Sequence, residues 1–166
     1  MILPDVLDYN LKIVFCGMAA SKKSKQVKAY YAGPGNKFWN TLYHVRLTSE
    51  KLKPEEFKQL ITYKIGLTDI CKTDFGNDIE LDSLKFDVKR FNSAIIEYQP
   101  KIVCFNGKKA AKVYFNKNSV EYGIQNEKIG KSKLFVAPST SGAASGFWDI
   151  NIWKILADII NQQNNI

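Results

Sequence analysis

The residues best suited to chemistry lie in three segments, two of which follow a short apolar run while the other begins with an aromatic pair. They are residues 17–21 (GMAAS), residues 30–39 (YYAGPGNKFW) and residues 138–148 (PSTSGAASGFW). Small residues let a backbone approach a ligand closely, and an aromatic ring that faces a pocket stacks on a nucleobase. Backbone N–H groups and hydroxyls bind phosphates. These compositions favour a site for a base and a sugar–phosphate backbone.

Each segment also has a plain structural interpretation. The first can be a tight strand exit, the third a flexible connection, and Asn36 can cap a helix whose Phe38 and Trp39 enter the core. Missing motifs argue against other chemistries. No GxGxxG or GxxxxGK[ST] supports a dinucleotide or nucleoside triphosphate, and no GxSxG supports a serine hydrolase. The single histidine, His44, and the lack of CxxC argue against zinc or iron–sulfur, so we expect no metal and no cofactor.

The elements that must position these segments alternate along the chain. Apolar runs predict strands over residues 11–16, 65–71, 101–105 and 133–137, and helical spacing predicts helices over residues 36–46, 54–63, 87–98, 108–115 and 149–161. This order predicts one domain over residues 1–166, a three-layer α/β/α sandwich with a mostly parallel four-stranded central sheet. In such sheets ligands bind beyond the carboxyl ends of the strands, where residues 17–35, 106–109 and 138–148 should meet.

The net charge of +8 is unevenly distributed. Between Asp8 and Glu50 the chain has seven basic residues and no acidic one, and the three loops at the predicted edge are also free of acids. This pattern favours a nucleic acid partner over a merely solvated lysine surface. A small nucleotide or phosphate is a weaker alternative, because the phosphate-binding motifs are missing.

The sequence also predicts the compartment. No run approaches the roughly 18 apolar residues of a membrane span, and the first residues lack the pattern of a signal peptide. Cys16, Cys71 and Cys104 are widely spaced and odd in number, so we expect buried thiols in a reducing compartment. We therefore expect a cytoplasmic monomer with no membrane partner, associated with the nucleoid in a bacterium.

Five motifs in order resemble the uracil-DNA glycosylase superfamily, and above all its mismatch-specific uracil/thymine branch. VFCGMAAS resembles a VFCG motif that continues to Asn-Pro-Gly, and YYAGPGNKFW resembles an aromatic followed by Ala-His-Pro-x-Asn-x-Phe-Trp. PSTSGAAS is similar to the second signature, Pro-(Asn/Ser)-(Pro/Ser)-Ser-(Gly/Ala). LKPEEFKQLITYKIGLTDI and YQPKIVCFNGKKA resemble the connecting motifs. The resemblance covers nearly the whole chain, and the combination is specific although each motif alone is weak.

The resemblance implies a DNA partner, double- or single-stranded, that contains a damaged or mismatched base. Such an enzyme flips the base into a pocket and hydrolyses its N-glycosidic bond without metal or cofactor, and uracil is the first expectation. Tyr31 would stack on the base. The substrate-binding residues carried over to this chain are Gly17, Met18, Ala19, Ala20, Ser21, Tyr31 and Phe38. The DNA-binding residues are Lys22, Lys23, Ser24, Lys108, Lys109, Ser139, Ser141, Gly142 and Ala143.

Three positions depart from the family pattern. The asparagine that positions the attacking water falls on Ala19, and the histidine of the His-Pro turn falls on Gly33. The residues that fill the vacated base stack, commonly Leu or Arg in the family, fall on Ala143, Ala144 and Ser145. Ordinary excision by the family's standard route is therefore in question.

Alanine cannot orient a water molecule, so another residue must replace the lost asparagine. Some branches, including the hypoxanthine type, use an asparagine in the tyrosine–proline–asparagine segment, where Asn36 stands. Asp69, at the end of the second predicted strand, is the other candidate, although an aspartate there can also cap a turn or helix. The alternative functions are a glycosylase for hypoxanthine or xanthine and a non-catalytic protein that binds lesions or mismatches.

Overall fold

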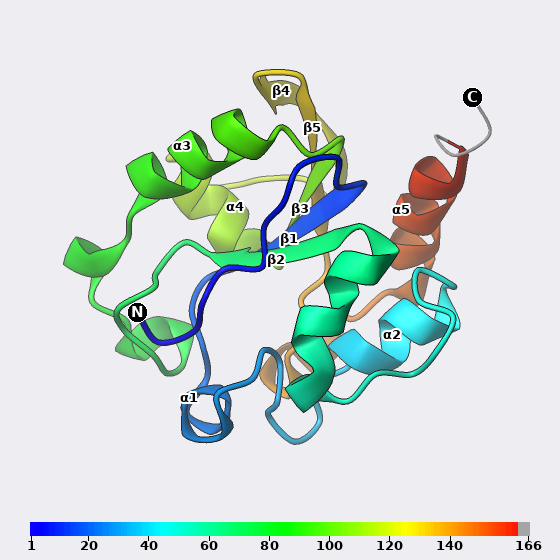
Figure 1. The fold of residues 1–166 in the computed structure, drawn as a ribbon. Coiled ribbons are helices and arrows are strands. Elements are labelled where there is room, and N and C mark those ends of the chain that lie inside the picture. The colour runs from blue at the N-terminus through cyan, green and yellow to red at the C-terminus, as the bar shows by residue number, and fades with distance from the viewer. Residues whose placement is uncertain (163–166) are drawn as a thin grey trace.

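The fold is built on one sheet, shown by a computed structural model that describes residues 1–162. Its strands are β1 (Ile13–Gly17), β2 (Ile65–Asp69), β3 (Ile102–Asn106), β4 (Gly123–Ile129) and β5 (Ser132–Ala137). They lie in the order β2-β1-β3-β5-β4, as Figure 1 shows. All neighbours pair in parallel except β4, which runs antiparallel to β5 at the edge.

Helices cover both faces of the sheet and form three layers (Figure 1). One face packs against α2 (Phe38–His44), the 3-10 helix η1 (Pro54–Tyr63) and α5 (Ile150–Gln162). The other packs against α3 (Val88–Tyr98) and α4 (Lys108–Phe115). The predicted three-layer α/β/α sandwich with a mostly parallel sheet is confirmed.

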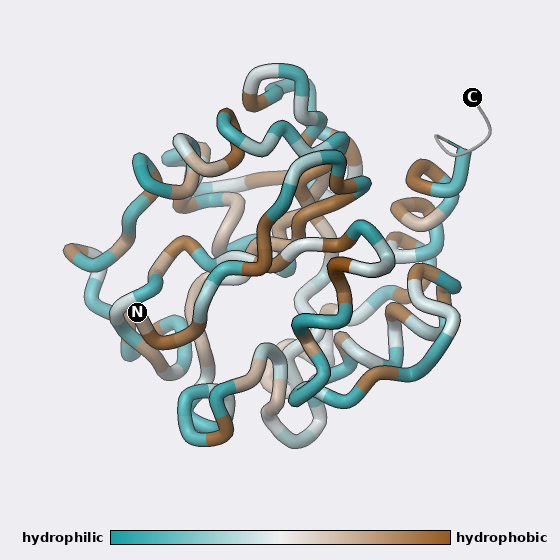
Figure 2. The backbone as a smooth tube through the Cα atoms, in the orientation of Figure 1, coloured by the Kyte–Doolittle hydropathy of each residue, from teal (hydrophilic) through white to brown (hydrophobic). Residues whose placement is uncertain are grey.

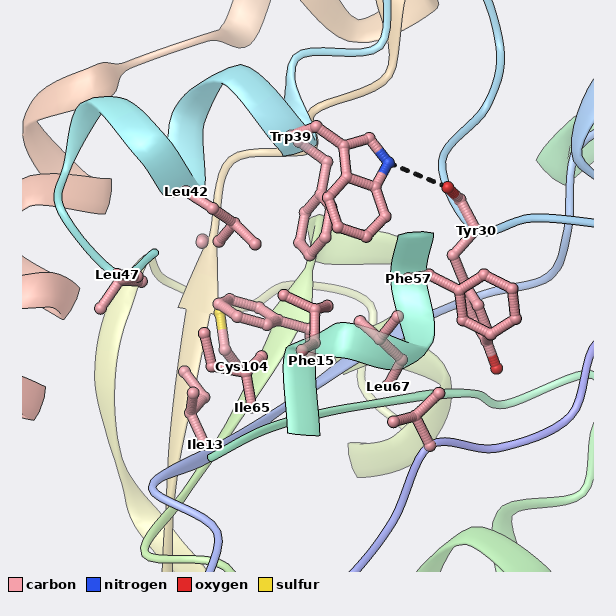
Figure 3. Close-up of a cluster of buried hydrophobic side chains, with 14 of the residues drawn as sticks. Ile13, Phe15, Tyr30, Trp39, Leu42, Leu47, Phe57, Ile65, Leu67 and Cys104 are labelled. Atoms are coloured by element: carbon pink, nitrogen blue, oxygen red, sulfur yellow. Dashed lines mark hydrogen bonds between the residues drawn. The ribbon is translucent and has the colours of Figure 1, made fainter. Parts of the chain in front are cut away.

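Strand β1 separates the two cores, because successive side chains of a strand point to opposite faces. Ile13 and Phe15 enter the first core, whereas Val14 and Cys16 enter the second. Figure 2 shows hydrophobic residues along the central strands and more hydrophilic stretches in many of the surrounding loops. In the first core the Trp39 indole N–H donates a hydrogen bond to the Tyr30 carbonyl at 3.0 Å (Figure 3). This bond satisfies the polar atom of the indole, so the large ring can be buried.

The sheet has five strands, so the predicted count of four was wrong. The missed strand, β4, lies at an edge, and its sequence GIQNEKI is mostly polar because much of it is exposed. Such a strand lacks the apolar run by which a buried strand is predicted from sequence. The helix predicted over residues 54–63 has these bounds but is a 3-10 helix.

Four short helices were not predicted. They are α1 (Lys22–Val27), η2 (Asp78–Glu80), η3 (Ser83–Lys85) and η4 (Gly142–Phe147). Each is too short to carry a helical hydrophobic period, and α1 is instead fixed by its ends. The Ser21 hydroxyl accepts a hydrogen bond from the Ser24 N–H at 3.0 Å, and Lys28 ends the helix in a left-handed conformation.

The three cysteines are buried and free, as the sequence predicted. Within residues 1–162, no helix combines the length and the apolar composition that a membrane crossing would require.

Candidate active site

The loops after β1, β3 and β5 meet at the carboxyl edge of the sheet. The Lys37 N–H donates to the Thr140 carbonyl at 2.8 Å, which joins the second and third segments. The Asn106 amide donates to the Thr140 hydroxyl at 2.9 Å and accepts from the Thr140 N–H at 3.0 Å. A Cβ on Gly107 would lie 3.0 Å from the Ser139 side chain, so the two loops are in close contact. Asn106, which sequence reasoning missed, thus fixes the hydroxyl-rich loop onto β3.

The chain leaving β1 runs beside the chain leaving β2. The carbonyls of Gly17, Met18 and Ala20 accept hydrogen bonds from Ile70 at 2.9 Å, Cys71 at 2.7 Å and Gly76 at 3.0 Å, respectively. These three carbonyls are therefore engaged within the protein. Any contact of this segment with a ligand must use its N–H groups or the half-buried Ala19 and Ser21.

Gly17 is the point at which two polar groups converge. A Cβ built on it would lie 2.8 Å from Oδ1 of Asp69 and 3.2 Å from the hydroxyl of Tyr31. Only glycine leaves room for both groups at the end of β1.

Tyr31 is held in an unusual state. Its backbone is left-handed, with φ of 52°, which few side chains other than glycine and asparagine adopt. Its ring packs on Phe38 with centroids 4.1 Å apart. Its hydroxyl is buried and has no hydrogen-bond partner within residues 1–162, although the side chain of Asn106, which is bonded to Thr140, lies near enough to lower the pKa of Tyr31 in part.

The state of Tyr31 has a chemical consequence. Burial, with the Asp69 carboxylate adding to it, raises the pKa of the Tyr31 hydroxyl well above its ordinary value, so it remains a donor. A buried hydroxyl without a partner costs about 1–3 kcal/mol, and backbone strain adds to that cost. Such costs concentrate at functional sites, where a ligand can supply the missing partner.

Asp69 is the second buried polar group at Gly17, and within residues 1–162 its carboxylate has only a long ion pair with Lys72. Its residue is 3% exposed, and its carboxylate forms no hydrogen bond within the described part of the chain. Burial raises the pKa of Asp69 to about 6, against the opposing effect of Lys72, whose Nζ lies 3.9 Å from Oδ2. Near neutral pH the carboxylate is therefore charged, poorly solvated and available to a ligand or water.

A largely buried ionic network of Asp5, Lys72 and Arg90 lies next to Asp69. The Lys72 Nζ lies 2.9 Å from the Asp5 carboxylate and donates to the Tyr30 hydroxyl at 2.9 Å. Arg90 pairs with Asp5 at 2.8 Å and donates to the Asp69 backbone carbonyl at 2.7 Å. Sequence reasoning missed this network, because its members lie far apart in the chain and only the fold brings them together.

Asn36 lies at the start of α2. Its side-chain oxygen accepts a hydrogen bond from the Phe38 N–H at 3.0 Å, but the N-cap position of α2 is Lys37, so Asn36 lies one residue before the predicted cap. Its side-chain nitrogen has no partner within residues 1–162 and stays available.

In the same part of the chain, no three His, Cys, Asp or Glu side chains gather in a group that could hold a metal ion.

A family model described as the uracil DNA glycosylase superfamily matches residues 4–158. The chain belongs to this superfamily. Its fold is similar to the solution NMR structure of a candidate uracil DNA glycosylase from Methanosarcina acetivorans, with a TM-score of 0.70. The two sequences are 24% identical, and the match covers 96% of each chain. Membership in the uracil DNA glycosylase superfamily supports a glycosylase function on DNA.

Two residues expected to contact substrate or DNA in this superfamily member have other roles. Ser24 is 2% exposed, and its hydroxyl binds the Ser21 hydroxyl at 3.1 Å and the Ala32 N–H at 3.1 Å. Its side chain shapes the loop from within, and its predicted contact with DNA stays a prediction. Phe38 is fully buried and its ring packs on that of Tyr31, so in this structure it supports Tyr31, and its predicted contact with the base stays a prediction.

The remaining predicted DNA-binding residues lie at the edge expected for a DNA glycosylase. Lys22, Lys23 and Lys109 are exposed, although Glu80 pairs with Lys22 at 3.2 Å. Lys108 is half-buried with its Nζ 4.3 Å from the centre of the Tyr122 ring. In the last loop, Ser139 and Ser141 are half-buried, while Gly142 and Ala143 are exposed. This surface is basic but not free of acids, because Glu80 pairs with Lys22 and the charge of Lys109 lowers the pKa of the nearby Asp78 against the larger effect of burial.

Gly17→Ala is expected to destabilise the protein by about 1–3 kcal/mol, the usual range for overpacking a filled site. The added methyl would force Asp69 or Tyr31 to move, because its carbon would lie 2.8 Å and 3.2 Å from their oxygens. Urea denaturation measures the change. Gly146→Ala is the matched control, since a Cβ there meets nothing within 4 Å. Equal stability of the two variants would contradict the geometry at Gly17.

Proposed function

We propose that this chain is a monofunctional, monomeric DNA repair glycosylase that flips a deaminated or mismatched base out of the helix and hydrolyses its N-glycosidic bond. Uracil is the first candidate base, and hypoxanthine and xanthine are the next. Within the superfamily, the motifs around residues 13–21 and 30–39 favour the mismatch-specific branch.

One observation carries the proposal: two buried groups converge at Gly17, the hydroxyl of Tyr31, which has no hydrogen-bond partner within residues 1–162, and the carboxylate of Asp69, which has only a long ion pair with Lys72. They lie at the sheet edge where α/β folds bind ligands, beside exposed lysines that attract a phosphate backbone. A flipped base offers polar ring atoms as partners for such groups, and DNA supplies the phosphates for the lysines.

The proposed mechanism uses only side chains of this protein. The face of the Tyr31 ring that does not pack on Phe38 stacks on the flipped base. A water adds its oxygen to the sugar carbon C1′ as the C1′–N bond breaks, and the base leaves with the bonding electrons and takes up a proton. The negative charge of Asp69 stabilises the developing positive charge on the sugar.

Two residues replace the asparagine that is lost at Ala19. The Asp69 carboxylate accepts a hydrogen bond from the water and takes up its proton, and Asn36 orients the water through its free amide nitrogen. The cation-stabilising and water-binding roles of Asp69 are compatible, because both require the ionised form.

The test is a panel of oligonucleotides with one uracil, hypoxanthine or xanthine, both single-stranded and in duplexes with each opposing base. Purified protein is expected to convert at least one substrate into an abasic product that alkali cleaves. DNA affinity should also fall steeply with salt, because lysine–phosphate contacts release counterions. Absence of base release from every substrate would overturn the glycosylase proposal.

A second candidate function is a non-catalytic protein that binds lesions, and Ala19 is the observation that favours it. Gel-shift binding to a lesion duplex without any abasic product would select this function. Binding that is independent of the lesion would contradict both functions.

A further inference from the structure

Lys72 is a buried cation that lies between two carboxylates. Its residue is 5% exposed, and its Nζ lies 2.9 Å from Oδ1 of Asp5 and 3.9 Å from Oδ2 of Asp69. The same Nζ donates a hydrogen bond to the Tyr30 hydroxyl at 2.9 Å. Taking an ammonium out of water is costly unless anions and acceptors surround it. Lys72 is therefore shared unequally between the two carboxylates, and Asp5 is the nearer one.

Asp5 is held in place by the N-terminal segment, which is dark blue in Figure 1. The Val6 N–H donates to the Leu67 carbonyl at 2.9 Å and the Leu67 N–H donates to the Val6 carbonyl at 2.9 Å, so this segment pairs with β2. The Asp5 carboxylate also accepts hydrogen bonds from the Thr68 hydroxyl and the Arg90 guanidinium, both at 2.8 Å. These bonds fix the carboxylate of Asp5 in position.

The two oxygens of Asp69 face different neighbours. Oδ2 lies 3.9 Å from the Lys72 Nζ, which is beyond hydrogen-bonding distance. Oδ1 lies on the side of Gly17, because a Cβ built on that glycine would be 2.8 Å from it. The Tyr31 hydroxyl lies on the same side, 3.2 Å from that Cβ. Lys72 thus supplies positive charge at one oxygen, while the other oxygen faces the end of β1.

The charged groups around Asp69 act on its carboxyl with opposite signs. Burial has the largest effect and raises the pKa of Asp69, and Lys72 has the next largest and lowers it. Asp5 raises the pKa of Asp69, and Arg90 lowers it. Three further titratable side chains around Asp69 stay neutral near pH 7, because burial raises their pKa: Cys16, Tyr30 and Tyr31. The charge on Asp69 therefore depends on the ions around it.

We propose that Asp5 and Lys72 are positioning residues for Asp69. Asp5 holds the Lys72 ammonium beside Asp69 without a hydrogen bond between the two, so the cation keeps the Asp69 carboxylate charged and leaves Oδ1 to accept the proton of the water. A lysine bonded directly to Asp69 would make this carboxylate a poorer proton acceptor. The inference rests on the proposed function, in which Asp69 is that acceptor.

The test follows the ionisation of Asp69 in Lys72→Met and Asp5→Asn, which remove opposite charges from one ion pair. The ¹³C resonance of the Asp69 carboxyl, assigned by its absence in Asp69→Asn, gives the titration midpoint of each folded protein without substrate. Lys72→Met should raise this midpoint from about 6 by about 1–3 pH units, because the nearest cation is lost. Asp5→Asn should lower it by about 1 unit, because the released ammonium then approaches Asp69.

Rates of base release by the same variants show whether this ionisation controls the reaction. On a substrate that wild type cleaves, the acidic limb of the pH profile should follow the midpoint in each variant. Lys72→Met should be slower than wild type by about 2- to 100-fold at pH 7 and within about 2-fold of it at pH 9. Tyr30→Phe is the matched control, since it removes a bond to Lys72 but no charge, and its limb should move by less than about 0.5 unit.

The outcomes separate this inference from the proposed function. Unmoved midpoints in both charge variants would overturn the inference, whether or not the protein releases base. If Lys72→Met does not fold, the direction of the shift in Asp5→Asn decides alone. An equal loss of rate at pH 7 and pH 9 in Lys72→Met would show a merely structural role and also overturn it, while the glycosylase stands. Shifted midpoints in a protein that releases no base would support the control of Asp69 by its neighbours and contradict the glycosylase.

Discussion

The Asp69→Asn variant should release base about 100- to 10,000-fold more slowly than wild type in single-turnover assays, the range typical of a lost acid–base group. Asparagine keeps the size of the side chain at Gly17 but carries no negative charge. The water then loses its proton acceptor, and the sugar loses the charge that stabilises it. Substrate affinity should change much less than the rate, which separates a chemical role from a binding role.

The dependence of the rate of base release on pH is a second test of the role of Asp69. Because burial raises the pKa of Asp69 to about 6, the carboxylate is ionised above that pH and protonated below it. Base release by wild type should therefore fall as the pH drops through about 6. The residual activity of Asp69→Asn should lack this acidic limb, and an unchanged limb in the variant would assign it to another group.

Asn36→Ala is the companion variant, with an expected loss of at least about 100-fold. Because the Asn36 side chain also accepts a hydrogen bond from the Phe38 N–H at the start of α2, the stability of Asn36→Ala must be measured, with Asn36→Asp as a variant that keeps this bond. Full activity in both Asn36→Ala and Asp69→Asn would show that neither residue replaces the missing asparagine, even if the function is right.

The strands of the sheet could be predicted because their side chains are buried on both faces. Strands β1, β3 and β5 read as continuous apolar runs, and their loops were correctly expected to meet at one edge. The alternation of strands and helices then determined the layers. β4 could not be found, because an exposed edge strand needs no apolar pattern, and its pairing with β5 depends on the rest of the sheet.

The site was predicted less completely than the fold. The small residues at the end of β1, the tyrosine pair and Asp69 were visible from composition and order. What composition could not show was orientation: Phe38 lies behind Tyr31, and Ser24 binds the inside of its own loop. The orientation of each side chain depends on contacts between segments that are distant in the sequence. Such contacts cannot be read from a single sequence.

At pH 8, Asp69→Asn should raise the free energy of unfolding by about 3 kcal/mol, although it is expected to slow base release. The pKa of Asp69 is about 6 in the folded protein against an ordinary value of 3.8, and each pKa unit corresponds to about 1.4 kcal/mol. Below about pH 4 both states bind the proton and the carboxyl costs nothing. Between about pH 4 and 6 the unfolded chain ionises first, so wild type loses stability as the pH rises, and above about 6 the full cost remains.

Denaturant unfolding at pH 4 and pH 8 checks this prediction, with the exposed Asp158→Asn as the matched control. The gain of Asp69→Asn should be absent at pH 4 and full at pH 8, whereas the control should change little at either pH. Equal stability of wild type and Asp69→Asn at pH 8 would mean that the buried charge is solvated or fully compensated by Lys72. A gain would instead show that the protein retains a costly carboxylate at Gly17, as expected where catalysis needs a poorly solvated charge.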